Sequence, residues 1–273
     1  MKHMKKLALF CSILLTLVMG SCDALFSNKF QELGLGQVDS AALATANSET
    51  LFAQSGINSG TISQSFIDAA LKDDTTKAAV VAELSTAAGD TDPKVAQTAQ
   101  ALLIEIKLQD TGAKQVVNNM GGLLDLFMSD DTLDPSTSAG MNAIIDTLVP
   151  PDLSDGDLAK VLNDLKDLAN NEVKDFGTNL STNGGLQNDN IDTASIAQTA
   201  VLATVVATLT PVDLSVSIGE ALVAALNNTD ETKNFDDFVT VPVGGLNSLT
   251  TDAGLTAIFN AAGLNELITK LSS

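Results

Sequence analysis

The segment from residue 154 to residue 169 most constrains the fold, because it joins a helix-start signal to one unbroken apolar stripe. Ser154 stands three residues before Asp157, a spacing that resembles a capping box with Asp in place of the usual Glu. Apolar residues then recur every three or four positions, and Asn, Asp and Lys fill the rest. Such a stripe must be buried against another element, so it predicts an amphipathic helix. Its apolar positions are Leu158, Val161, Leu162, Leu165, Leu168 and Ala169.

Other helix signals recur along the chain. Asp92-Pro93 places Asp at an N-cap and Pro at the first helical position, and Gly112 is suited to end that helix. Asp134-Pro135 repeats the start signal and predicts a helix to about Leu148. The region from Gly177 to Asp189 is expected to be a loop, and 235–243 a short strand or a loop. Further helices are predicted at 38–54, 75–88 with Asp74 as N-cap, 114–128 interrupted at Gly121-Gly122, 215–226 and 253–271.

The segment Thr193–Val212 carries no charged residue and predicts the most apolar helix after the N-terminal region. Its length approaches the roughly 20 apolar residues that a bilayer span needs. However, Gln198, Thr199 and Pro211 dilute it, which favours a central core helix over a membrane span. Its apolar positions include Ile196, Val201, Leu202, Val205, Val206 and Leu209.

Two stretches of the chain resemble each other and indicate an internal repeat. Residues 147–154 (TLVPPDLS) match residues 208–215 (TLTPVDLS), and Gly121-Gly122-Leu123 recurs at 184–186 and 244–246. Units of about 60 residues that bury apolar faces against their neighbours would explain this pattern. The alternative is chance similarity among helices rich in Ala, Leu and Thr. The predicted fold class is therefore all-α, either a multi-helix bundle or a short helical-repeat array. Units are expected near 61–120, 121–183, 184–243 and 244–273.

The N-terminus has the pattern of an export signal. Lysines at positions 2, 5 and 6 precede an apolar run from Leu7 to Val18, which is too short to span a bilayer. Met19-Gly20-Ser21-Cys22 then resembles the lipobox of bacterial lipoproteins, in a relaxed form similar to that of spirochaetes. The resemblance implies removal of residues 1–21 and lipidation of Cys22. A lipid-anchored tether and first helix would follow at 22–60, and a helical domain at 61–273.

Lipidation implies a protein anchored to a membrane of a bacterial envelope, on its periplasmic or cell-surface face. Whether that membrane is inner or outer stays open. The alternative is an ordinary cleaved signal with a chance cysteine. Cys11 lies inside the apolar run, so Cys22 would be the one thiol left after cleavage. A lone thiol in an exported protein is otherwise unexplained, which favours the lipid anchor.

Composition excludes several classes of function. The chain carries a formal net charge of −20 and contains no arginine, so it offers nucleic acid no basic surface. His3 is the one histidine and lies in the expected signal, whereas Trp and Tyr are absent throughout. Nucleophile–histidine pairs and zinc sites built from imidazole or thiolate are therefore excluded after cleavage. We expect a protein that is not an enzyme and needs no cofactor.

Acidic motifs give little support for a catalytic or metal site. Asp110-Thr-Gly112 spells the aspartic-protease triplet, but only one copy is present, and Gly112 is better interpreted as a helix C-cap. The stretches 130–134 and 188–192 are rich in Asp and Asn, yet neither has the glycine and glutamate of an EF-hand loop. We interpret them as solvated turns and helix caps, and we predict no metal site.

Three hypotheses for the function follow. The leading one is a non-enzymatic binding or scaffold role, in which grooves between amphipathic helices hold an envelope protein or an apolar ligand. The alternative is a lipid-binding or membrane-interacting protein, and the third is a carboxylate-based hydrolase. The predicted contact face consists of Leu158, Val161, Leu162, Leu165, Val201 and Val205.

Overall fold

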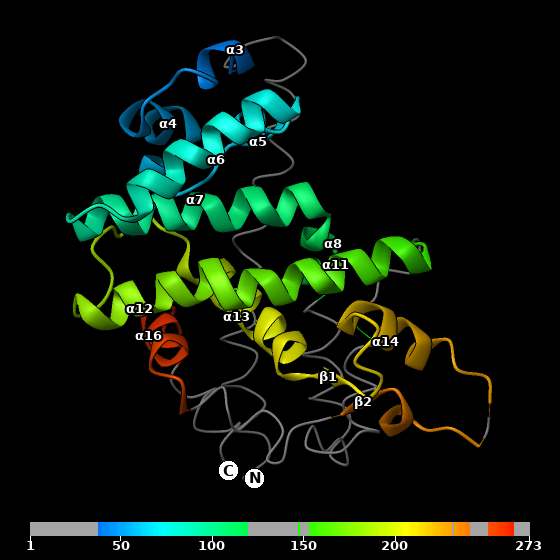
Figure 1. Ribbon diagram of the computed structural model, residues 1–273. Coiled ribbons are helices and arrows are strands. Elements are labelled where there is room, and N and C mark those ends of the chain that lie inside the picture. Colours follow the sequence, from blue (N-terminus) through cyan, green and yellow to red (C-terminus); the bar gives the residue numbers. More distant parts are fainter. Residues whose placement is uncertain (1–37, 120–146, 148–152, 231, 241–250, 265–273) are drawn as a thin grey trace, which may run out of the picture.

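The computed structural model describes residues 38–119, 147, 153–230, 232–240 and 251–264. These residues are mainly helical, which confirms the all-α class (Figure 1). The N-terminal elements are α3 (Ser40–Leu43), α4 (Ser48–Ser55), the 3₁₀ turn η2 (Ile57–Ser59), α5 (Gln64–Ala70), α6 (Asp74–Ala88), α7 (Pro93–Thr111) and α8 (Ala113–Asn118). The C-terminal elements are α11 (Asp155–Leu168), the π-helical η3 (Ala169–Val173), α12 (Lys174–Thr182), α13 (Thr193–Thr208), β1 (Thr210–Pro211), α14 (Ile218–Leu226), the 3₁₀ turn η4 (Phe235–Asp237), β2 (Val239–Thr240) and α16 (Ala253–Ala261).

The first described segment forms two short helices where one was predicted. Asn47 separates α3 from α4, because its backbone is extended and its side chain caps α4 by accepting a hydrogen bond from Thr50 N. Leu43, Leu51 and Ile57 are all buried in the common core. Residues from Ser40 onward therefore pack with the helical domain, and they include the first helix that the pattern placed within residues 22–60.

Helices α6 and α7 lie side by side and follow the predicted signals closely (Figure 1). Asp73, one residue before the predicted Asp74, caps α6 by accepting a hydrogen bond from Thr76 N. Asp92 caps α7 with Pro93 at its first turn, as predicted. Gly112 ends α7 in the left-handed region at φ 77°, which also confirms its interpretation as a C-cap.

Helices α11, η3 and α12 form one continuous helical rod below α7 (Figure 1). Ser154 caps the rod, with its hydroxyl accepting a hydrogen bond from Asp157 N, as predicted. The prediction of a loop beginning at Gly177 was wrong, because the helix continues to Thr182. Phe176 and Leu180 are fully buried, so packing of α12 outweighs the low helix propensity of its Gly, Asn, Ser and Thr residues.

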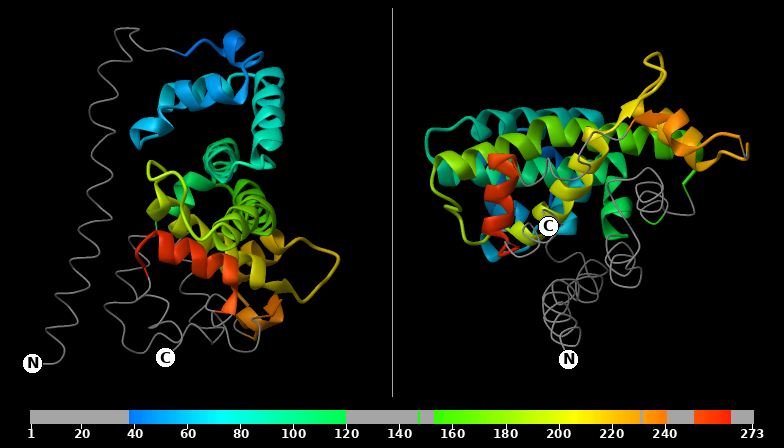
Figure 2. Two further views of the ribbon diagram at one scale, coloured as in Figure 1. Left: turned by 90° about the vertical axis from the view of Figure 1, so that its left-hand side faces the viewer. Right: turned by 90° about the horizontal axis from the view of Figure 1, so that it is seen from below.

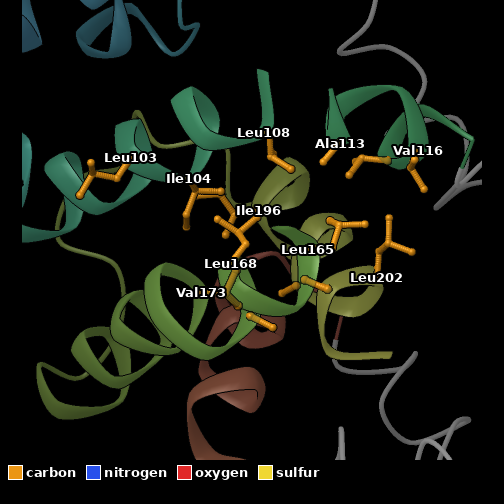
Figure 3. Packing of buried hydrophobic residues seen from close by; sticks show 14 of the residues in the cluster. Leu103, Ile104, Leu108, Ala113, Val116, Leu165, Leu168, Val173, Ile196 and Leu202 are labelled. Carbon is orange, nitrogen blue, oxygen red and sulfur yellow. The ribbon is translucent and has the colours of Figure 1, made fainter. Parts of the chain in front are cut away.

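Helix α13 occupies the middle of the bundle, as predicted for its uncharged sequence. Ile196 and Leu202 point toward side chains of α7, α8 and the α11 rod in Figure 3, and Ala197, Ala200 and Ala203 are also buried. The helix ends at Thr208, one residue before Leu209, the last apolar position predicted for it, and Thr210 and Pro211 form β1. Among the described residues, no helix is both long enough and apolar enough to cross a membrane.

The C-terminal elements pack onto the rod through close backbone contacts. Gly219 of α14 lies against Ala159 of α11, and Gly177 of α12 lies against Gly254 of α16. Strands β1 and β2 form an antiparallel ribbon in which Thr210 pairs with Thr240. This ribbon accounts for the short strand expected within 235–243.

Several predictions fall outside the described residues: the signal and Cys22, the breaks at Gly121-Gly122 and Pro150-Pro151, the acidic stretch 130–134, and nearly all of the helix predicted to start at Asp134-Pro135. The two matched segments behave differently where they are described. Ser154 caps a helix directly, whereas its counterpart Ser215 lies two residues before the cap, which is Ser217. The units of about 60 residues therefore stay a prediction.

Candidate binding loop

The predicted contact face is occupied by the chain itself. Leu158, Val161, Leu162, Leu165 and Val205 are buried, and Val201 is partly buried against the same core. Helix α11, which carries four of these residues, packs on α7, α13 and α14. An apolar helical stripe lowers the free energy most by packing within its own domain. A ligand could reach the buried side chains of this face only after a helix had moved away.

A different segment, which we call the 212–216 loop, presents apolar side chains to solvent. Val212 is 50% exposed, Leu214 81% and Val216 36%, and these are the large hydrophobic residues that are exposed in the part of the chain that the structure describes. A single exposed leucine is ordinary on a protein surface. Three apolar side chains are exposed on this one five-residue loop, and exposed apolar surface of this kind can mark an interaction site.

The 212–216 loop is held at its N-terminal end by the ribbon. Val212 N donates a hydrogen bond to Phe238 O at 2.9 Å, which extends the pairing of β1 with β2 by one residue. Asp213 Oδ1 then accepts from Ser215 N at 2.9 Å and from Ser215 Oγ at 2.7 Å. These bonds form an Asx turn that fixes the loop backbone. In the right-hand view of Figure 2, the yellow segment after β1 projects beyond the neighbouring helices.

The loop is held at its C-terminal end by the start of α14. Ser217 and Glu220 form a capping box there. Asn163 of α11 donates from Nδ2 to Ser217 Oγ at 3.0 Å and accepts at Oδ1 from Gly219 N at 2.9 Å. A Cβ on Gly219 would lie 1.9 Å from Ala159 O, so only glycine allows this approach. The C-terminal end of the loop is therefore attached to α11 by these hydrogen bonds and by the close backbone contact at Gly219.

Hydrogen bonds lower the pKa of carboxylates in the loop and in the elements that follow it. The side chain and then the backbone of Ser215 lower the pKa of Asp213. The backbone and then the side chain of Ser217 lower the pKa of Glu220, and the Thr232 side chain and backbone lower the pKa of Asp230. All three carboxylates are exposed. Asp213 and Glu220 therefore present negative charge beside the exposed apolar side chains of the loop at neutral pH.

The acidic motifs singled out in the sequence have structural partners elsewhere. Asp110 pairs with Lys77 at 3.0 Å. Asn188 is buried and donates to Thr98 Oγ1 at 2.8 Å, and Asp192 caps α13, which confirms the cap interpretation at that position. The stretch 188–192 thus joins the α12–α13 connection to α7.

A concavity lies between α3 and α5, with a volume of about 700 Å³. Its polar groups belong mainly to exposed side chains, so they do not converge on an enclosed ligand. Its lining residues are Val38, Asp39, Ser40, Ser65, Asp68, Ala69 and Lys72.

Sequence reasoning missed the 212–216 loop because it treated residues 208–215 only as one copy of a repeated segment. The available signal was the alternation of apolar and polar residues directly after Pro211, a period of two instead of the helical 3.6. Comparison with known proteins found no matching family model, no matching curated protein and no matching solved structure.

Proposed function

We propose that this chain is a non-enzymatic binding or scaffold protein of a bacterial envelope, and that it contacts a protein partner through the 212–216 loop. The proposal rests on the exposure of Leu214, which lies in the middle of a loop that hydrogen bonds hold at both ends. This contact replaces the groove between amphipathic helices that the sequence had indicated, because the helices fill that space themselves.

The energetics of such a contact are favourable. Full burial of a leucine or valine side chain contributes about 1.5–3 kcal/mol. The Asx turn and the capping box already order the loop backbone, so binding would cost little further conformational entropy. Polar residues between the three apolar ones would remain at the rim and exclude water from the centre of the contact.

The proposed anchor is Cys22, which would hold the domain at the membrane while the loop meets its partner. Dual acylation gives stable anchoring, whereas a single chain gives only marginal binding. Metabolic labelling with a palmitate analogue should modify the wild-type chain and not a Cys22→Ser variant. Labelling of both, or of neither, would contradict the anchor without bearing on the loop.

The loop is tested by photocrosslinking in the intact host. A benzoylphenylalanine residue at position 214 should give one discrete protein adduct, and the same residue at exposed Asp90, in the α6–α7 turn, serves as the control. The proposal predicts the adduct at 214 alone. Identical adducts at both positions, or crosslinking at 214 to lipid only, would reject a protein contact through this loop.

A further inference from the structure

We infer that the partner presents an apolar pocket rimmed by lysine or arginine. This inference deepens the proposed function and depends on it. It rests on the charges in the 212–216 loop and on its neighbouring elements, whereas the proposed function rests on the exposure of the loop's apolar side chains.

Exposed carboxylates lie in the loop and on the elements that pack with its neighbours. Asp213 and Glu220 lie within or beside it in sequence, and both are exposed. Helix α11, which packs on α14, contributes exposed Asp155 and Asp157 from its first turn, about two turns before Asn163. The η4 turn packs on β2 and α14. It contributes exposed Asp236 and Asp237.

Of the lysines in the same described region, Lys160 pairs with Asp164 at 2.7 Å, and Lys233 lies 5.6 Å from the ring centroid of Phe238. The exposed apolar side chains therefore lie among elements that carry more acidic than basic residues. Complementary positive charge on a partner would speed association and select against acidic surfaces.

The same charges disfavour two other occupants. A second copy of this chain would bring one set of carboxylates against another. An anionic bilayer surface would be repelled in the same way. Asp213 lies between the exposed Val212 and Leu214, so insertion of these side chains into any bilayer would also bury an ionised carboxylate. A basic protein surface avoids all of these costs.

The test uses the purified full-length chain and two synthetic amphipathic peptides with identical leucine positions. One peptide has lysine at its polar positions and the other has glutamate. Fluorescence anisotropy should show binding of the lysine peptide alone, with affinity rising as salt is lowered. The Leu214→Ser variant, which keeps the charge, should weaken this binding about tenfold or more.

Two double variants separate the local charge from the overall charge. Asp213→Asn with Glu220→Gln keeps the hydrogen-bond acceptors and removes two charges beside the loop. Asp175→Asn with Asp189→Asn removes two exposed charges near the far end of the rod. The first pair should weaken binding of the lysine peptide about three- to tenfold, and the second should leave it nearly unchanged.

The outcomes separate the inference from the proposed function. Equal binding of both peptides, still dependent on Leu214, overturns the basic partner and leaves the loop as a contact site. Binding of the lysine peptide that ignores Leu214, or that responds equally to the two double variants, reflects general attraction to an acidic protein and overturns the inference. No binding of the lysine peptide overturns it also. Flotation of the Cys22→Ser chain with phosphatidylcholine vesicles, dependent on Leu214, would replace the protein partner by a membrane.

Discussion

The apolar face of α11 and the 212–216 loop both present Leu and Val, but the face is buried and the loop is exposed. Leu165 is 0% exposed in the centre of the bundle, whereas Leu214 is 81% exposed on a loop mounted on the same helix. The α11 residues follow the helical period, so their side chains meet α7, α13 and α14 along one stripe. The loop residues alternate with polar ones and have no such stripe to join. Apolar periodicity therefore predicts core, and apolar residues outside it are the better candidates for binding.

The largest expected effect follows from replacing a residue of the packed face. Leu165→Ala should lower the free energy of unfolding by about 2–5 kcal/mol, because it leaves a cavity among α7, α11 and α13. Leu214→Ala, the matched control, should change it by less than about 0.5 kcal/mol. Urea denaturation followed by circular dichroism measures both. Similar losses for the two variants would remove the contrast between the regions.

A substitution at Gly219 should disrupt the contact between α14 and α11 that holds the C-terminal end of the loop. Alanine there would collide with Ala159 O, so Gly219→Ala should cost about 1–3 kcal/mol of stability and displace the start of α14. Gly156→Ala, in the first turn of α11, is the control because a Cβ there meets nothing within 4 Å. That variant should be neutral or slightly stabilising. A neutral result at Gly219 as well would show that the two helices are less closely packed than the structure has them.

The polar bridge from α11 to the loop is expected to contribute less. Asn163→Ala removes two hydrogen bonds at the start of α14 and should cost about 1–2 kcal/mol. Asn163→Asp keeps an acceptor for Gly219 N and should cost less. Amide hydrogen exchange should report faster exchange in the first turn of α14 for the alanine variant. Unchanged exchange there would mean that the capping box holds the helix start alone.

The smallest effect concerns pH. Because the folded-state pKa of Glu220 is lowered by Ser217, its ionised form stabilises the fold above the usual glutamate pKa of about 4.3, and this contribution is lost as pH falls through the lowered value. Stability measured from neutral to acid pH should therefore fall less steeply in Glu220→Gln than in the wild type. Glu49→Gln, in the first turn of α4, is a control for charge alone. Parallel curves for the wild type and Glu220→Gln would contradict this role.

Local signals in the sequence predicted much of the fold. Ser154, Asp92 and Gly112 mark helix ends where the pattern placed them, because capping depends on residues close in the chain. The loop predicted at Gly177 failed for a non-local reason. Gly177 lies against Gly254, far along the chain, and Phe176 enters a core that no local pattern reveals. The exposed loop was missed similarly, since exposure depends on which faces the other helices cover.

Thiol accessibility tests most directly whether the 212–216 loop is exposed while the α11 face is buried. Leu214→Cys and Leu162→Cys are placed separately in a chain with Cys11→Ser and Cys22→Ser, and maleimide labelling is timed under native conditions. Because position 214 is exposed, Cys there should react about as fast as in an unfolded chain. Cys at 162 should react roughly a thousandfold more slowly, because it needs unfolding of the bundle. Comparable protection at 214 would show that the loop is already covered and would contradict its role as a free contact surface.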